Sequence, residues 1–336
     1  MKVTISGGFW SKKRSIVSEI SIPYQWKVLG DQIDGAPPSY ALQNLRIASG
    51  ECTGTVQGFS FQDTDVAKWL EAASYSLCFN ANTQLEVWMQ EAIRLIGAAQ
   101  RDDGYINSHF LSKEQQEMQG IPHSEIKDRR WEDLKWGHEL YTAGHLIEAG
   151  TAHYAATGKK DLLAVVSRLA DCLVQTFGKE EGKKHMCCGH PEIELALFRL
   201  FEATGNESYK DLALYFLDIR GTDPAFFART ASEKNDEMRK WLDADYFVAH
   251  EPVRKMRTAA GHAVRAVYLY EAMADAVYYT GDEQMKEALF CLWDNMVFKQ
   301  MYITGGIGSQ GHGERFTIDY DLPNGAAYTE TCASIG

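Results

Sequence analysis

Three segments of the sequence repeat the same helix ending, and this repeat limits the folds open to the chain. They read ATGKKDLL (residues 156–163), ATGNESYKDLA (203–213) and YTGDEQMKEAL (279–289). In each, apolar helical periodicity stops at a Thr-Gly pair and a new helical pattern starts within a few residues. Glycine suits the left-handed position that closes a helix, so each segment predicts a turn between two helices. Repeat units of roughly 40–50 residues are typical of stacked αα-hairpins.

Helical periodicity also covers most of the remaining chain. Apolar residues recur at three- and four-residue spacing over residues 63–78, 83–99, 132–157, 191–204, 207–218, 258–279 and 282–298. Long segments without this periodicity separate the helices, at 21–62, 100–130, 219–257 and 300–328. Loops of such length inside a compact domain usually carry function. The sequence therefore predicts an all-α fold of helical hairpins, arranged as a solenoid or closed into a toroid.

The charge balance and the cysteines exclude several classes of partner. The chain has 46 acidic and 34 basic residues, a formal net charge of −12, whereas binding to nucleic acid requires clustered Lys and Arg. No segment is long and apolar enough for a signal peptide or a membrane span. The seven cysteines form no disulfide framework and favour a reducing compartment. We therefore expect a cytoplasmic protein without a nucleic-acid or membrane partner.

Two carboxylates and a thiol stand out near the end of the chain. Glu314 lies in GHGERF, within a glycine-rich segment, and Glu330 and Cys332 form an E-x-C pair. A lone glutamate beside an arginine is usually a surface ion pair. A carboxylate and a thiolate can both bind Zn²⁺, but a tetrahedral site needs further ligands, and a buried structural cysteine is the commoner arrangement. Residue type alone leaves both interpretations open.

Histidines and a cysteine pair form the other candidates. HMCCGH places Cys187 and Cys188 beside His190, but adjacent cysteines rarely bind one ion, so we expect no metal site there. His138 and His145 lie two turns apart on one face of a helix. His190 and His262 each begin a helix; a single histidine at that position is usually structural, whereas several at matching hairpin ends can converge on one cavity. No phosphate-binding or nucleophile-elbow motif is present.

Short motifs distributed from near the start of the chain to its last residue resemble glycoside hydrolase family 127, which includes the bacterial β-L-arabinofuranosidases. They are IPYQW (22–26), LRIASG (45–50), DVAKWLEA (65–72), DGYINS (103–108), HELYTAGHLIEA (138–149), GHPEIELAL (190–198), GHAVRAVYL (261–269), TGGIGS (304–309), GERF (313–316), LPN (322–324) and ETCASIG (330–336). Each motif is modest by itself, but together they are specific. The resemblance implies an (α/α)6-barrel catalytic domain over residues 1–336, which agrees with the hairpin repeat.

The resemblance also implies roles for particular residues. It implies a retaining mechanism with a cysteine nucleophile held on Zn²⁺ and a glutamate acid/base, which Glu314 matches. Glu330 and Cys332 match two zinc ligands. The family's histidines that line the sugar pocket correspond to His145, His190 and His262.

The family's other two zinc ligands are an adjacent cysteine pair that follows the ETCAS motif, and one of the two is the nucleophile. In this family that pair falls after residue 336, so the sequence is either a C-terminally truncated copy or the ordered part of a longer protein. For the 336-residue polypeptide alone we expect an incomplete barrel with an exposed apolar flank, no stoichiometric zinc and no turnover.

The expected function is that of a retaining exo-glycosidase acting on β-L-arabinofuranosides of plant origin. Its partner would be an oligosaccharide or glycoside substrate, and an oligomer is compatible with the sequence. The alternative is a non-catalytic helical toroid that binds a sugar or a protein partner. The second cysteine pair discriminates between the two.

Overall fold

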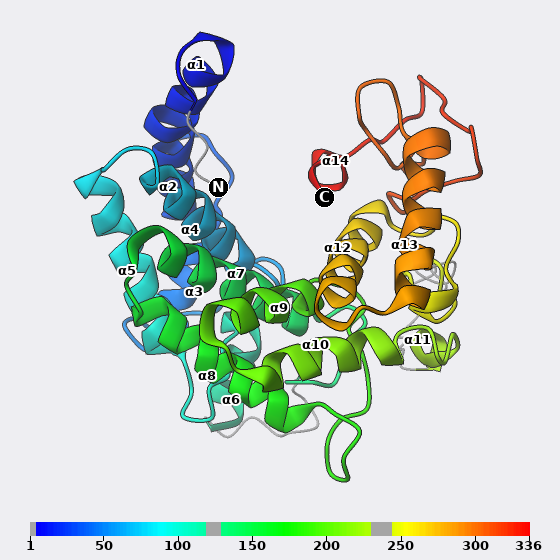
Figure 1. The fold of residues 1–336 in the computed structure, drawn as a ribbon. Coiled ribbons are helices and arrows are strands. Elements are labelled where there is room, and N and C mark those ends of the chain that lie inside the picture. Colours follow the sequence, from blue (N-terminus) through cyan, green and yellow to red (C-terminus); the bar gives the residue numbers. More distant parts are fainter. Residues whose placement is uncertain (1–4, 119–128, 230–243) are drawn as a thin grey trace. The chain divides into compact units, whose positions relative to one another are not determined.

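The computed structural model describes residues 5–118, 129–229 and 244–336 (Figure 1). Helix accounts for 58% of the structure, and the described residues contain isolated bridges but no β-strand. The prediction of an all-α fold is therefore confirmed. In the same ranges, no helix combines the length and apolarity needed to cross a membrane.

The helices group into two compact units. Unit 1 comprises residues 1–130 and 145–172, and unit 2 comprises residues 131–144 and 173–336. Both α7 (Glu139–Thr157) and α8 (Asp161–Thr176) contribute residues to each unit. The two units are described separately below.

Unit 1 is a set of short amphipathic helices around a tryptophan-rich core. It contains α1 (Gly8–Ile16), the π-helical turn η1 (Val17–Ser21), α2 (Ile22–Leu29), α3 (Ala41–Ala48), α4 (Asp63–Leu77), α5 (Thr83–Ala99) and α6 (Ser108–Met118). Helix α3 packs against α4, α5 and α6. The ring of Trp26 lies 4.6 Å from that of Trp69, whose indole N–H donates to the carbonyl of Ile22 at 2.9 Å. This bond satisfies the polar end of a buried aromatic side chain.

Unit 2 is built on two helices that are buried over most of their surface. It contains α9 (Ile193–Thr204), α10 (Glu207–Ile219), α11 (Phe226–Arg229), the 3₁₀ turn η4 (Val253–Lys255), α12 (Ala263–Thr280), α13 (Glu283–Asn295), the π-helical turn η5 (Met296–Gln300) and α14 (Thr331–Ile335). Helix α9 packs against α10 and α12, and α12 also packs against α13 and α14 (Figure 1). Six consecutive residues at the start of α9 are buried, as expected for a helix covered on all sides.

The Thr-Gly repeat forms the helix endings that the sequence predicts. Gly158, Gly205 and Gly281 follow α7, α9 and α12 in the left-handed conformation, with φ of 71°, 73° and 67°. In all three, the preceding threonine hydroxyl donates to the carbonyl four residues earlier, at 2.6–2.7 Å. The same oxygen accepts the amide N–H two residues later, at 3.1–3.3 Å. The hydroxyl thus bridges the helix end and the start of the next connection.

The expected long loops are only partly correct. Segment 21–62 contains α2 and α3, segment 100–130 contains α6, and segment 219–257 contains α11 and η4. Parts of two of these segments, 119–128 and 230–243, lie outside the described residues. The sequence analysis also did not predict helix α8. The missed helices α2 and α3 have eight residues each. Helices of this length have little stability of their own, and packing rather than propensity stabilises them. Residues 301–328 contain no helix, as predicted.

An apolar groove of about 650 Å³ lies between α12 and α13. Val267 of α12 and Leu289 and Trp293 of α13 are among the residues that line it. The side chains of Trp293 and Phe290 are 59% and 62% exposed. Unit 2 therefore has an exposed apolar surface between these two helices.

The glycine endings make a prediction about stability. Gly205→Ala is expected to lower the free energy of unfolding by about 1–2 kcal/mol, because a side chain is strained in the left-handed region. A Cβ at Gly205 would meet no atom within 4 Å. At Gly221, with φ of 73°, it would lie 1.9 Å from the carbonyl oxygen of Glu251. Gly221→Ala should therefore cost about 2–5 kcal/mol, because overpacking adds to the strain. Urea denaturation measures both, and equal costs would contradict this account.

Candidate active site in the second unit

Five of the six site residues predicted from the sequence lie in unit 2, and the structure brings three of them together. The ligand atoms of His262, Glu314 and Glu330 lie within 4.8 Å of one another. Cys332 follows two residues after Glu330, in the first turn of α14, and is exposed. Helix α12, the glycine-rich segment 301–328 and the start of α14 thus contribute to one site.

His262 has a dual role at the start of α12. It is the N-cap residue of this helix, and its Nδ1 accepts the backbone N–H of Arg265 at 3.2 Å. Its Nε2 lies 2.7 Å from Oε2 of Glu314. Because Nδ1 already accepts a hydrogen bond, the ring proton must lie on Nε2, which donates it to the carboxylate. Burial lowers the pKa of His262, although Glu314 opposes this. The ring is therefore a neutral imidazole with a fixed tautomer.

Glu314 is held by hydrogen bonds to its backbone and to both carboxylate oxygens. Its backbone has a φ of 52°, and its carbonyl accepts the N–H of Ala263, the first residue of α12, at 2.9 Å. Its Oε1 accepts from the hydroxyl of Tyr328 at 3.0 Å. The hydrogen bond from His262 is the largest cause that lowers the pKa of Glu314, and Tyr328 adds to it while burial opposes it. Glu314 is thus a carboxylate at neutral pH, and a non-glycine residue at this φ indicates stored strain.

His190 lies at the centre of a cluster of rings. Its ring centroid is 5.7 Å from that of His262, 4.5 Å from Tyr141 and 5.7 Å from Tyr268. Its Nδ1 lies 2.8 Å from the carbonyl oxygen of Pro191. Since a carbonyl can only accept, Nδ1 carries the proton and Nε2 is left as an acceptor. Burial is the largest cause that lowers the pKa of His190 well below its usual value.

His138 belongs to the same cluster, and the sequence analysis did not assign it to the site. Its ring centroid lies 5.9 Å from that of His190, and its Nδ1 lies 2.5 Å from the carbonyl oxygen of Trp136. Nδ1 is therefore the donor here too, and Nε2 is an acceptor. His138 directly precedes α7, just as His262 directly precedes α12. That shared position at a helix start is the signal that could have identified it.

His145, by contrast, belongs to unit 1. It is buried, and its Nδ1 lies 3.6 Å from Oε2 of Glu148. Burial lowers its pKa well below the usual value. The ring contacts of His190 described above do not include it, and its role in sugar binding stays a prediction.

A buried ion pair supports the segment that precedes His190. Arg220 and Glu194 are 0% and 1% exposed, with Nη2 and Oε1 3.1 Å apart. Arg220 also donates to the carbonyl of Cys188 at 2.9 Å, and the thiol of Cys188 donates to the carbonyl of His190 at 2.8 Å. Burial raises the pKa of Cys188 well above its usual value. Cys187 and Cys188 are thus buried thiols in a structural role.

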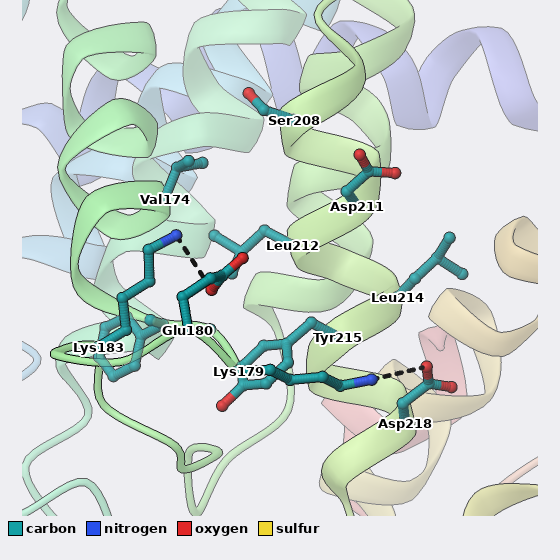
Figure 2. A pocket seen from close by; sticks show the side chains of 12 residues that line it. Val174, Lys179, Glu180, Lys183, Ser208, Asp211, Leu212, Leu214, Tyr215 and Asp218 are labelled. Atoms are coloured by element: carbon teal, nitrogen blue, oxygen red, sulfur yellow. Dashed lines mark ion pairs between the residues drawn. The ribbon is translucent and has the colours of Figure 1, made fainter.

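A separate polar hollow of about 370 Å³ lies beside α10 (Figure 2). Lys183 pairs with Glu180 at 3.3 Å and Lys179 with Asp218 at 4.0 Å, as Figure 2 shows. These charges neutralise one another at the surface, where such pairs contribute little stability. The hollow includes none of the histidines or carboxylates of the candidate site.

Comparisons with known proteins identify the family to which the chain is similar. The family model described as β-L-arabinofuranosidase, GH127 catalytic domain, matches residues 2–336. The curated non-reducing end β-L-arabinofuranosidase of Bifidobacterium longum subsp. longum is 40% identical over 357 positions, which cover 100% of this chain and 52% of that protein.

Solved structures give the same result. A GH127 β-L-arabinofuranosidase from Geobacillus stearothermophilus T6 has 45% identity and a TM-score of 0.92, over 100% of this chain and 51% of its own. A GH127 β-arabinofuranosidase has 36% identity and a TM-score of 0.84, over 99% of this chain and 48% of its own. The chain therefore spans about half the length of these relatives, and the match confirms a fold of the (α/α)6-barrel class.

The thiols differ in burial, which predicts a difference in reactivity. Cys332 and Cys78 are exposed, whereas Cys187 and Cys188 are buried with pKa values raised by burial. Because only the thiolate reacts, iodoacetamide should alkylate the first two and leave the second two unmodified in the native protein. Peptide mass spectrometry measures this, and a sample in guanidinium, where all should react, is the control. Rapid native labelling of Cys188 would contradict its structural role.

Proposed function

Since the chain belongs to the family of GH127 β-L-arabinofuranosidase catalytic domains, we propose that the protein containing it is a glycoside hydrolase that removes β-L-arabinofuranose from the non-reducing end of plant-derived glycosides. Residues 1–336 would form the greater part of its catalytic domain. The observation that carries the proposal is the hydrogen bond that Nε2–H of His262 donates to the carboxylate of Glu314, beside a cluster of neutral imidazole rings.

The imidazole cluster suits a sugar because its hydrogen bonds have fixed directions. Nε2 of His190 remains an acceptor, because its Nδ1 donates to a backbone carbonyl. Sugar hydroxyls are both donors and acceptors, so a hydroxyl can donate to this nitrogen. The rings of Tyr141 and Tyr268 flank His190. Neutral rings bind an uncharged furanose without burying a net charge.

Glu314 would act as the acid and the base of a retaining double displacement. It protonates the departing glycosidic oxygen and later deprotonates the incoming water. Its Oε2 accepts from His262, whose Nε2 must keep its proton while Nδ1 caps α12. The proton that Glu314 transfers must therefore sit on Oε1, the oxygen that faces Tyr328. A bound sugar that displaces water from Glu314 raises its pKa and favours the protonated form.

Glu330 and Cys332 are the residues that would hold Zn²⁺. The pKa of Tyr328 is raised to about 12, chiefly by its hydrogen bond to Glu314, and the charges of Glu330 and Cys332 add to this. A carboxylate and a thiol therefore lie together beside Tyr328, and both are suitable zinc donors. A zinc site needs three or four ligands, and these residues supply two of them. In the described ranges, no group of three possible metal ligands includes Cys332.

When bound, zinc lowers the pKa of a coordinated thiol, which makes that thiol a nucleophile. We propose that the nucleophile is a cysteine of the longer protein, as the family resemblance implies. The alternative, a non-catalytic sugar-binding protein, predicts binding of arabinose without hydrolysis.

Replacing Glu314 tests the proposed acid/base. Glu314→Gln, made in the full-length protein, keeps a side-chain oxygen that can accept from His262 but removes proton transfer. The kcat on 4-nitrophenyl β-L-arabinofuranoside should fall about 10²–10⁴-fold. The loss should be smaller for a substrate with a more acidic aryl leaving group, because its departing oxygen needs less protonation. The matched variant Glu330→Gln should instead lower the zinc content measured by elemental analysis. Zinc loss in Glu314→Gln, with full activity when zinc is restored, would contradict the assignment.

Alanine variants of the histidines decide which of them contact the sugar. His138→Ala and His190→Ala should each lower kcat/KM about 10–100-fold, since buried hydrogen-bonding groups of the sugar lose their partners. His262→Ala should lower it as well, because Oε2 of Glu314 loses its donor. The zinc content of all three variants should stay unchanged. His145→Ala in the same assay tests the residue that the sequence predicts. A larger loss for His145→Ala than for His138→Ala would assign the sugar contact to His145.

A further inference from the structure

Arg265 is a buried cation at the start of α12. It lies in the first turn of α12 and is 2% exposed. In the described parts of the chain its guanidinium forms no ion pair, and its Nη1 has no hydrogen-bond partner. Burial accordingly lowers its pKa. Arg220, which is equally buried, has the carboxylate of Glu194 at 3.1 Å. Burying a charge without an ion pair is costly. Interactions with Tyr246 and with the charge of Glu314 oppose this cost, so the cation depends on groups of the candidate site.

The contacts of Arg265 join two parts of the candidate site. Its Nε donates to the carbonyl of Gly189, the residue before His190, at 3.0 Å. The amide of Gly189 donates to the carbonyl of Leu134 at 2.8 Å, and a Cβ at Gly189 would lie 2.2 Å from the carbonyl oxygen of Lys135. The backbone in front of His190 is therefore held between residues 134–135 on one side and the guanidinium of Arg265 on the other.

The other end of the link is His262. The backbone N–H of Arg265 donates to Nδ1 of His262, which fixes the tautomer of that ring. The guanidinium lies over the ring of Tyr246 at 4.3 Å, and this ring contacts that of His262 edge-on at 5.5 Å. A planar guanidinium can stack on a ring and donate a directed hydrogen bond at the same time, which an ammonium group cannot.

We propose that Arg265 is a positioning residue for the sugar site: it fixes the distance between His190 and His262 and keeps the acceptor nitrogen of His190 directed at the substrate. The proposal rests on the proposed function only in naming a sugar as the ligand. The structural link between the two rings stands without it.

The positive charge of Arg265 contributes as well. After burial, the charge of Arg265 is the next largest cause that lowers the pKa of His190, ahead of His138 and His262. A neutral His190 keeps Nε2 as an acceptor, whereas a protonated ring would repel a hydroxyl hydrogen. The groups that face His190 are these two histidines, Tyr141 and Tyr268, and none of them supplies a positive charge while the histidines are neutral.

Two substitutions in the full-length protein separate geometry from charge. Arg265→Met removes both the charge and the bond to Gly189, and Arg265→Lys keeps the charge but not the planar group. We expect kcat/KM for the aryl arabinofuranoside to fall about 10–100-fold in both, because a displacement of about 1 Å costs up to 10²-fold. Imidazole ¹⁵N spectra should show His190 as the Nδ1–H tautomer at pH 7 in the wild type, and a mixture of forms in Arg265→Met.

Met273→Ala is the matched control. Met273 is fully buried in the same helix, so this variant should melt at a lower temperature, with kcat/KM unchanged within about twofold. Arg265 variants that behave like Met273→Ala and keep the wild-type spectrum of His190 would overturn the proposal. If Arg265→Met does not fold, kcat/KM and the imidazole spectrum of His190 are measured on Arg265→Lys, and they test the proposal in the same way. A wild-type protein without hydrolase activity rejects the proposed function alone, because the spectrum of His190 still tests the role of Arg265.

Discussion

The first turn of α12 is the element on which the candidate site depends. A helix begins with amide groups that have no partner inside the helix, and here two of them are satisfied by the site. The N–H of Ala263 donates to the carbonyl of Glu314, and the N–H of Arg265 donates to Nδ1 of His262. The same helix end therefore fixes the loop that carries the carboxylate and the tautomer of the ring that holds it. A change in either bond would alter local helix stability and the direction of the Nε2–H together.

The functional side chains lie where the backbone leaves regular structure. Glu314 and His138 have φ of 52° and 57°, a conformation that costs a non-glycine residue about 1–2 kcal/mol. Rigid helices on either side allow this strain to persist, because α9 and α12 are buried along most of their length. His138, His190 and His262 all lie at or just before a helix start, and this brings their rings together. The contacts around Glu314 and His138 keep this strained backbone in place.

Local sequence signals predicted the helix endings well and the short helices badly. The Thr-Gly endings depend on the conformation of glycine and on a hydroxyl bond within a few residues, so Gly158, Gly205 and Gly281 could be identified from the sequence. Helices α2 and α3 are short, and they are stabilised by contacts with residues distant in the chain, such as that of Trp26 with Trp69. No local pattern records such contacts.

The residues of the candidate site were likewise only partly predictable from the sequence. The resemblance to a family assigned His190, His262, Glu314 and Glu330 to a site, and the structure places the last three within reach of one another. It assigned the histidine of the HELYTAGH segment to His145, whereas His138 is the one whose ring meets His190. Helical periodicity places both on one face, so it could not separate them. In the structure His138 precedes α7 with a φ of 57°, whereas His145 lies within the helix.

The charges around the site explain why neutral rings suit this position. Glu314 is a carboxylate with two donors, and Arg265 is a buried cation whose charge lowers the pKa of Glu314. Their charges oppose each other across His262, so neither requires a proton on the imidazole. If His262 were protonated, its Nδ1 could no longer accept from α12, and the helix would lose its cap. The helix end thus favours the neutral ring, and the neutral ring leaves Oε1 of Glu314 as the carboxylate oxygen that can carry a proton.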